Sequence, residues 1–253
     1  MTSFKLATCT VTLDGYADPA GTARRMTLLS DAASALSKNG IELFSLPGGY
    51  LFASSNADVY ALQKQIENMA ISTNIDLLVG IDTTMKVYHP DVELIRRGQL
   101  GALAVFAPKN GQVTRWRQRT STRNNQHLVS DAVCKEVRFL RGTPQIEGLL
   151  CGEIFNKRIR VELAARETRI VIDQAHNASR FRIWAAMRAL AQMGVSSLCS
   201  VHADRQGAIK HCYVPTQTGW EEKSSRSIDL KIGDKPRLEI KIWEFDRYGS
   251  IVA

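Results

Sequence analysis

The sequence predicts a mixed α/β protein that folds as one layered domain. Apolar segments of strand length alternate with longer segments whose apolar residues recur at helical spacing. In the middle of the chain, several strand-like segments follow one another without a helix, which favours layers over a simple repeated strand–helix unit. No linker rich in Pro, Gly or Ser and no internal repeat divides residues 1–253, a length that suits one large domain.

The first third of the chain is predicted to alternate strands and helices. The first helix begins at Pro19, behind the capping residue Asp18, and ends at Gly40, which accepts a left-handed turn. A second helix is expected over residues 58–73, where apolar residues lie on one face. The strands of this part are expected at residues 4–13, 41–47 and 75–81.

The rest of the chain is predicted to contain more strands than helices. Residues 119–135 are polar and irregular, and residues 216–236 are the most loop-like segment, joining a last hairpin. Helices are expected at residues 157–167 and 179–193. Strands are expected at residues 86–95, 102–107, 112–118, 136–142, 146–151, 169–173, 195–201 and 238–245.

Composition places the chain among soluble globular proteins. Hydrophobic residues make up 44% and charged residues 23%, and no apolar run approaches the roughly 18 residues that a membrane span needs. The N-terminus lacks the basic and apolar regions of a signal peptide. The five cysteines are odd in number and widely spaced, which fits free thiols in a reducing compartment. A cytoplasmic protein without membrane association is expected.

The net charge of +8 is concentrated in residues 94–141. This region holds ten basic and two acidic residues, so it carries the whole excess. A local excess of positive charge favours binding of an anionic ligand, an acidic partner or nucleic acid. A solvated basic surface is the alternative interpretation.

Cys151 is the first candidate for a reactive group. An apolar run ends at this cysteine, Gly152 follows, and a helix is expected shortly after. A strand-to-helix turn can expose a nucleophile among backbone N–H groups, and a helix N-terminus makes a thiol more reactive. A buried structural cysteine is the alternative, because free cysteines are commonly buried.

Several segments in order resemble the nitrilase superfamily of carbon–nitrogen hydrolases. GIELFSLPGGYLF (40–52) resembles the family's first catalytic strand, GQVTRWRQRT (111–120) the lysine-bearing strand, and GLLCGEIF (148–155) the nucleophile segment. IDLLVGI, RVELAARETRIVID and RIWAAMRALAQMGVSSLCSV resemble further core segments of the family. The resemblance implies a four-layer α-β-β-α sandwich over residues 1–253, with Cys151 in the nucleophile position.

The resemblance also implies catalytic partners that this chain has replaced. In the family a glutamate is the general base, a lysine stabilises the oxyanion, and a second glutamate orients the site. Gly48 stands where the first glutamate would follow Pro47, and Gln118 stands in the lysine's place. Gln126 aligns with the second glutamate. Cys151 is retained, together with Glu153.

These replacements predict a degenerate member of the superfamily. Its Cys151 pocket would bind a small anionic or amide-bearing ligand with weak or no hydrolysis, because a weak nucleophile needs a base and developing charge needs a fixed donor. An active cysteine-dependent amidohydrolase is the alternative. Its substitute groups would be His176 as base and Arg117 or Arg119 as cation, although a strand slip toward either arginine needs a bulge.

No cofactor or metal is expected. Cys199, His202, His211 and Cys212 have zinc-ligating side chains, but adjacent His211 and Cys212 would point to opposite faces of a strand. No phosphate-binding loop or dinucleotide-binding motif is present. The expected partners are a small-molecule ligand and, by the resemblance, a second copy of the chain. The third functional alternative is an interaction protein whose basic region 94–141 binds nucleic acid or an acidic partner.

Overall fold

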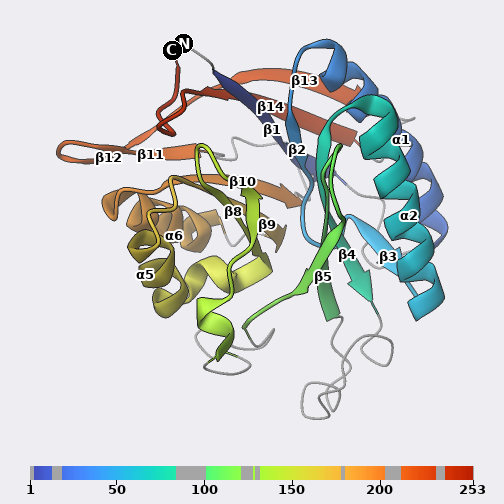
Figure 1. The fold of residues 1–253 in the computed structure, drawn as a ribbon, viewed down its shortest axis with the longest axis horizontal. Coiled ribbons are helices and arrows are strands. Elements are labelled where there is room, and N and C mark those ends of the chain that lie inside the picture. Colours follow the sequence, from blue (N-terminus) through green and yellow to red (C-terminus); the bar gives the residue numbers. More distant parts are fainter. Residues whose placement is uncertain are drawn as a thin grey trace.

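A computed structural model describes residues 3–12, 19–83, 101–120, 128, 132–177, 180–202, 212–231 and 237–252. Figure 1 shows its helices and strands. The helices are α1 (Pro19–Lys38), α2 (Asn56–Thr73), η1 (Ala132–Lys135), η2 (Cys151–Phe155), α5 (Lys157–Ala165) and α6 (Arg180–Gln192), where η marks a 3₁₀ helix. The strands are β1 (Phe4–Thr12), β2 (Leu43–Ser45), β3 (Leu51–Ala53), β4 (Asp76–Thr83), β5 (Gly101–Ala107), β6 (Thr114–Arg117), β7 (Phe139–Arg141), β8 (Ile146–Leu150), β9 (Ile170–Asn177), β10 (Ser196–His202), β11 (Cys212–Thr216), β12 (Gly219–Glu222), β13 (Arg226–Lys231) and β14 (Arg237–Phe245).

The strands form one continuous sheet that curls so that its two halves pack face to face. Its main path runs β6-β5-β4-β2-β1-β10-β9-β8-β7. β1 pairs in parallel with β2 and with β10, so it joins the two halves. The parallel strands β2, β4, β8, β9 and β10 place their carboxyl ends together. In open parallel sheets, ligands bind beyond these carboxyl ends.

Three separate apolar cores define four layers. Helices α1 and α2 cover one outer face of the sheet, while α5 and α6 cover the other (Figure 1). The middle core lies between the two sheet halves and includes Leu6, Phe106, Ile172 and Trp243. Since neighbouring strand residues face opposite ways, Leu6 lies in this middle core and Ala7 lies in the core under the helices. The expected α-β-β-α sandwich is confirmed.

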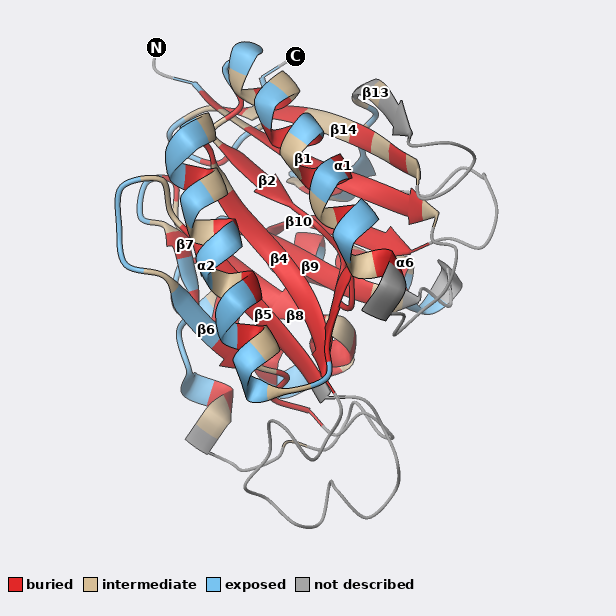
Figure 2. Cartoon of the chain, turned by 90° about the vertical axis from the view of Figure 1, so that its right-hand side faces the viewer, coloured by how far each residue is buried: buried red, intermediate tan, exposed pale blue. Residues whose placement is uncertain are grey.

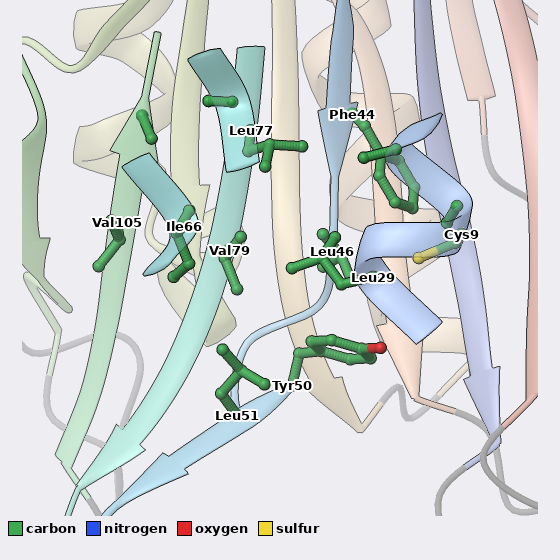
Figure 3. Close-up of a cluster of buried hydrophobic side chains, with 14 of the residues drawn as sticks. Cys9, Leu29, Phe44, Leu46, Tyr50, Leu51, Ile66, Leu77, Val79 and Val105 are labelled. Carbon is green, nitrogen blue, oxygen red and sulfur yellow. The ribbon is translucent and has the colours of Figure 1, made fainter. Parts of the chain in front are cut away.

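The core under α1 and α2 fixes the first half of the sheet. In this core Ile66 of α2 lies between Val79 of β4 and Val105 of β5, and Leu29 of α1 lies beside Leu46 (Figure 3). Figure 2 shows both helices lying over buried strands, with their outer faces exposed. Burying one such side chain contributes on the order of 1.5–3 kcal/mol.

The expected helices agree closely with the observed ones. α2 begins two residues before the predicted position because the Ser55 hydroxyl accepts a hydrogen bond from the Asp58 N–H and caps the helix. The helix ends at Asn74, whose left-handed backbone (φ 57°) closes the last turn. No helix of the described residues is both long enough and apolar enough to cross a membrane.

The prediction of a loop over residues 216–236 was wrong for much of the segment. β12 and β13 lie within it, and β13 pairs along its whole length with β14. Short edge strands with alternating polar residues carry little apolar signal, which explains the error. The short strands β3 and β11 were also not expected. The strand predicted at residues 86–95 lies outside the described residues.

Candidate active site

Cys151 stands at a sharp turn where strand β8 ends. It is the first residue of η2, and its φ is +55°. A residue other than glycine rarely adopts this left-handed backbone conformation. Backbone strain of this kind is concentrated at functional sites. Cys151 is partly exposed, whereas the other four cysteines are buried. The turn therefore presents one accessible thiol at the carboxyl end of the sheet.

His176 reaches the same place through a bulge in β9. In the pairing of β9 with β10, Val201 lies opposite Ala175 and His202 lies opposite Asn177, so His176 is the extra residue. A bulge of this kind redirects a side chain and is common beside active sites. The His176 side chain keeps 21% of its surface exposed.

His176 interacts with two neighbouring side chains, those of Asp82 and Cys151. Nε2 of His176 hydrogen bonds with Oδ1 of Asp82, and the ring also interacts electrostatically with Cys151. Burial lowers the pKa of His176, but the charges and hydrogen bonds of Asp82 and Cys151 outweigh it and raise that pKa well above its usual value. The arrangement favours the charged imidazolium form of His176.

Two glycines make room for the imidazole. A Cβ on Gly48 would lie 2.7 Å from His176 Nδ1 and 2.8 Å from the Gln174 carbonyl oxygen. A Cβ on Gly49 would lie 2.7 Å from His176 Nε2, and Gly49 also has a left-handed φ of +66°. The resemblance implies a glutamate at residue 48. The His176 ring, which comes from β9, occupies the space that such a side chain would need.

Glu153 holds the nucleophile turn and is not placed as a base. Its carboxylate accepts hydrogen bonds from the Leu150 N–H, from the Arg119 N–H and guanidinium, and from the Arg138 guanidinium at 2.9 Å. Burial raises the pKa of Glu153, but Arg119 and Arg138 outweigh burial and hold that pKa below its usual value. Glu153 is fully buried and ion-paired, so it holds η2 in place from its buried side.

The arginines proposed as replacement cations are placed elsewhere. The Arg119 guanidinium is buried against Glu153. β6 pairs with β5 in unbroken register, so Arg117 points to the face opposite Trp116, the face on which Arg115 stacks over the Tyr60 ring. The described residues show no bulge in β6 that would turn Arg117 inward.

The backbone of Gln118 lies close to the strand that carries Asp82. Its N–H donates to the Ala102 carbonyl, and Ala102 pairs with Asp82 across β4 and β5. Its side-chain Nε2 donates to the Thr120 hydroxyl at 2.9 Å. The Gln118 backbone is therefore bonded to the strand partner of Asp82, and the convergence of Gly48, Gln118 and Cys151 on one pocket stays a prediction. Gln126 lies outside the described residues.

The residues considered for zinc are dispersed. Cys199 packs in the core under α5 and α6, whereas Cys212 packs in the middle core. His202 is buried and contacts the Gly48 carbonyl. His211 lies outside the described residues.

The basic region 94–141 is partly internal. Arg119 and Arg138 are buried with Glu153, and Arg141 pairs with Glu42 at 2.8 Å. Arg96, Arg97 and Arg123 lie outside the described residues. Part of the local charge excess is therefore structural and does not face solvent.

Sequence reasoning did not identify Asp82 or the contact of His202 with the Gly48 carbonyl. Asp82 directly follows the apolar segment IDLLVGI, and a carboxylate at the end of a buried strand was a usable signal. Its hydrogen-bond partner, His176, lies 94 residues away in the sequence. His202 was considered only as a zinc ligand.

The four-layer arrangement is the fold of nitrilase-superfamily amidases. An amidase from Nesterenkonia sp. is similar to the chain with a TM-score of 0.61 and 17% identity, over 97% of this chain and 92% of the amidase. A mutant of the Nesterenkonia sp. AN1 amidase in complex with butyramide gives a TM-score of 0.61 and 16% identity, over 94% and 90%. Another mutant carries the acetamide moiety of fluoroacetamide covalently at its active-site cysteine, with a TM-score of 0.61 and 17% identity, over 94% and 89%. No protein-family model and no curated protein matches the sequence.

Proposed function

We propose that the chain is a cysteine-dependent carbon–nitrogen hydrolase of the amidase type, in which His176 and Asp82 take the place of the family's general base beside the retained Cys151. The observation that carries this proposal is the placement of His176 between Asp82 and Cys151. A nucleophile, a base and a group that orients the base are the recurring parts of thiol and serine hydrolases.

The reaction follows from these positions. The Cys151 thiolate attacks the carbonyl carbon of an amide, and the C–N bond breaks as the His176 imidazolium gives its proton to the leaving amine. The acyl group is then held on sulfur as a thioester. His176 takes a proton from water, the resulting hydroxide attacks the thioester, and the C–S bond breaks to release a carboxylic acid. Asp82 keeps the imidazole aligned and stabilises its charged form.

Gln118 is assigned the role of a neutral oxyanion donor. It stands where the resemblance implies a lysine, and an amide N–H stabilises developing negative charge less than an ammonium does. Losing one oxyanion donor costs about 10²–10³-fold in kcat. A slow enzyme is therefore expected.

Binding without hydrolysis is the second candidate function. The neutral Gln118 favours it, as does the pairing of Arg119 and Arg138 with Glu153, which directs both guanidiniums at a structural carboxylate. In this degenerate form the Cys151 pocket would hold a small amide-bearing or anionic ligand. A homodimer and a nucleic-acid or acidic partner for residues 94–141 stay predictions.

Small amides distinguish the two candidates. The ligands of the structural neighbours make butyramide a suitable substrate and fluoroacetamide a suitable label. Ammonia release from butyramide that is lost in both Cys151→Ala and His176→Asn supports the hydrolase. Protection of Cys151 from iodoacetamide by butyramide, without ammonia release, supports binding alone. Neither turnover nor protection, together with no labelling by fluoroacetamide, would contradict both candidates for short amides.

A further inference from the structure

The His176 ring rests against a short turn formed by Gly48 and Gly49. A Cβ on either glycine would lie 2.7 Å from a ring nitrogen, so the glycine backbone is in direct contact with the imidazole. Any displacement of this turn would change the space that the ring occupies. The position of the Gly48 main chain is therefore a determinant of the alignment between Asp82 and Cys151.

Side chains from the opposite sheet half hold the segment that leads to this turn. The Ser200 hydroxyl donates to the Ser45 carbonyl at 2.8 Å, and the Gln174 amide donates to the Leu46 carbonyl at 2.7 Å. Nε2 of His202 lies 2.8 Å from the Gly48 carbonyl oxygen. Of these three contacts, the one from His202 reaches the residue that touches His176.

His202 makes this contact as a neutral donor. A carbonyl oxygen can only accept, so Nε2 carries the proton. The ring is buried, with 2% of its surface exposed. The charged groups that act on it are His176 of β9 and Arg25 of α1, and both are cations. Burial first, and then these cations, lower the pKa of His202 to about 3 despite the Gly48 hydrogen bond.

We propose that His202 is a positioning residue that holds the Gly48 carbonyl and thereby keeps the His176 imidazole aligned between Asp82 and Cys151. The inference rests on the proposed function, because it concerns the alignment of that triad. His202 contacts neither substrate nor the reacting sulfur in this role. It acts through the turn, and it acts without charge, so no second positive charge competes with the His176 imidazolium.

The test replaces the donor and follows the reactivity of Cys151. His202→Leu removes the hydrogen bond, whereas His202→Gln places an amide N–H near the position of Nε2. Ser200→Ala is the matched control, because it removes a buried hydrogen bond of the same length from the same strand to a different carbonyl, together with the hydrogen bond that the Ser200 hydroxyl accepts from the Cys9 N–H. The rate of iodoacetamide labelling is measured from pH 5 to pH 9 on protein whose folding is checked by circular dichroism.

We expect the labelling rate at pH 6 to fall about 10-fold or more in His202→Leu, since a displacement of about 1 Å can cost up to 10²-fold. His202→Gln should recover most of the rate, and Ser200→Ala should keep the wild-type pH profile. A merely structural role would lower thermal stability in all three variants without changing the profile of the folded protein. If His202→Leu does not fold, His202→Asn replaces it, because its shorter amide does not reach the Gly48 carbonyl.

The outcomes separate the two proposals. A wild-type thiol that reacts at pH 6 no faster than an ordinary thiol contradicts the proposed function itself. A wild-type thiol that is activated, together with an unchanged profile in His202→Leu or His202→Asn, overturns only the role of His202.

Discussion

Gly48 and His176 depend on each other: the imidazole occupies the space into which any side chain on residue 48 would project. A Cβ there would lie 2.7 Å from Nδ1 and 2.8 Å from Cε1 of the ring. The glutamate that the resemblance implies at residue 48 and the histidine found at residue 176 therefore exclude each other. The absence of a side chain at residue 48 is what gives the His176 ring its space. A glutamate introduced at residue 48 would displace His176 and would not restore a catalytic set.

Gly48→Ala tests this exclusion. The added methyl would press on His176 and on the Gln174 carbonyl, of which the second is backbone and cannot move cheaply. We expect the labelling rate of Cys151 near neutral pH to fall by about 10²-fold in a folded protein. Gly142→Ala is the control, because a Cβ on Gly142 meets nothing within 4 Å. Equal rates in both variants would show that the turn tolerates a side chain.

Asp82→Asn tests the orientation of the imidazole. The Asp82 carboxylate helps to raise the pKa of His176, so its loss lets the imidazolium lose its proton at lower pH. Hydrolysis of butyramide is expected to fall roughly 10²–10⁴-fold, and the NMR titration of His176 is expected to shift to lower pH. An unshifted titration would mean that Asp82 does not act on His176.

Glu153→Gln tests the buried ion pairs beneath the nucleophile. Removing the carboxylate leaves Arg119 buried without its anion and Arg138 with only the Glu136 carboxylate, which is expected to cost about 3–5 kcal/mol of unfolding free energy. Glu136→Gln is the control, since that carboxylate pairs with Arg138 at 3.0 Å but is 41% exposed, and a change within about 1 kcal/mol is expected. Urea unfolding measures both, and equal losses would contradict the assigned role of Glu153.

The Glu153 carboxylate also makes the stability of the folded protein depend on pH in acid. The pKa of Glu153 is lowered from 4.5 in the folded protein, so the folded state binds fewer protons than the unfolded chain below that pH. Its contribution is present above about pH 4.5 and is lost as pH falls through the lower folded value. The difference in Tm between wild type and Glu153→Gln should therefore shrink in acid. A difference that stays constant down to pH 3 would contradict this linkage.

His202 contributes a second acid-dependent part of stability. The unfolded chain takes up a proton below about pH 6.5, whereas the folded protein excludes it until about pH 3. Stability from this group is present above pH 6.5 and declines as pH falls between these values. His202→Gln should flatten the dependence of Tm on pH over that window relative to wild type. The same slope in both proteins would show that His202 is already charged in the folded state.

The layered fold and part of the site could be predicted from the sequence. Helical periodicity located α1 and α2, and the ordered motifs placed Cys151 at a strand-to-helix turn. The triad could not be predicted, because it depends on a bulge that turns His176 toward Cys151 and on a contact between residues 82 and 176. At residue 48 the sequence indicates only that a glutamate is missing. The structure shows that the His176 ring occupies the space into which a side chain there would project. Arg119 looked like a free cation because its buried partner, Glu153, follows 34 residues later.

The state of Cys151 in the resting protein is the most direct test of the Cys151–His176–Asp82 arrangement. The other four cysteines are buried, so iodoacetamide labelling of the folded protein reports on this thiol. The wild-type protein is expected to react at pH 6 nearly as fast as at pH 8, and His176→Asn is expected to lose this reactivity at pH 6. Labelling that rises steeply between pH 6 and pH 9 and is the same in wild type and His176→Asn would contradict a thiolate–imidazolium pair.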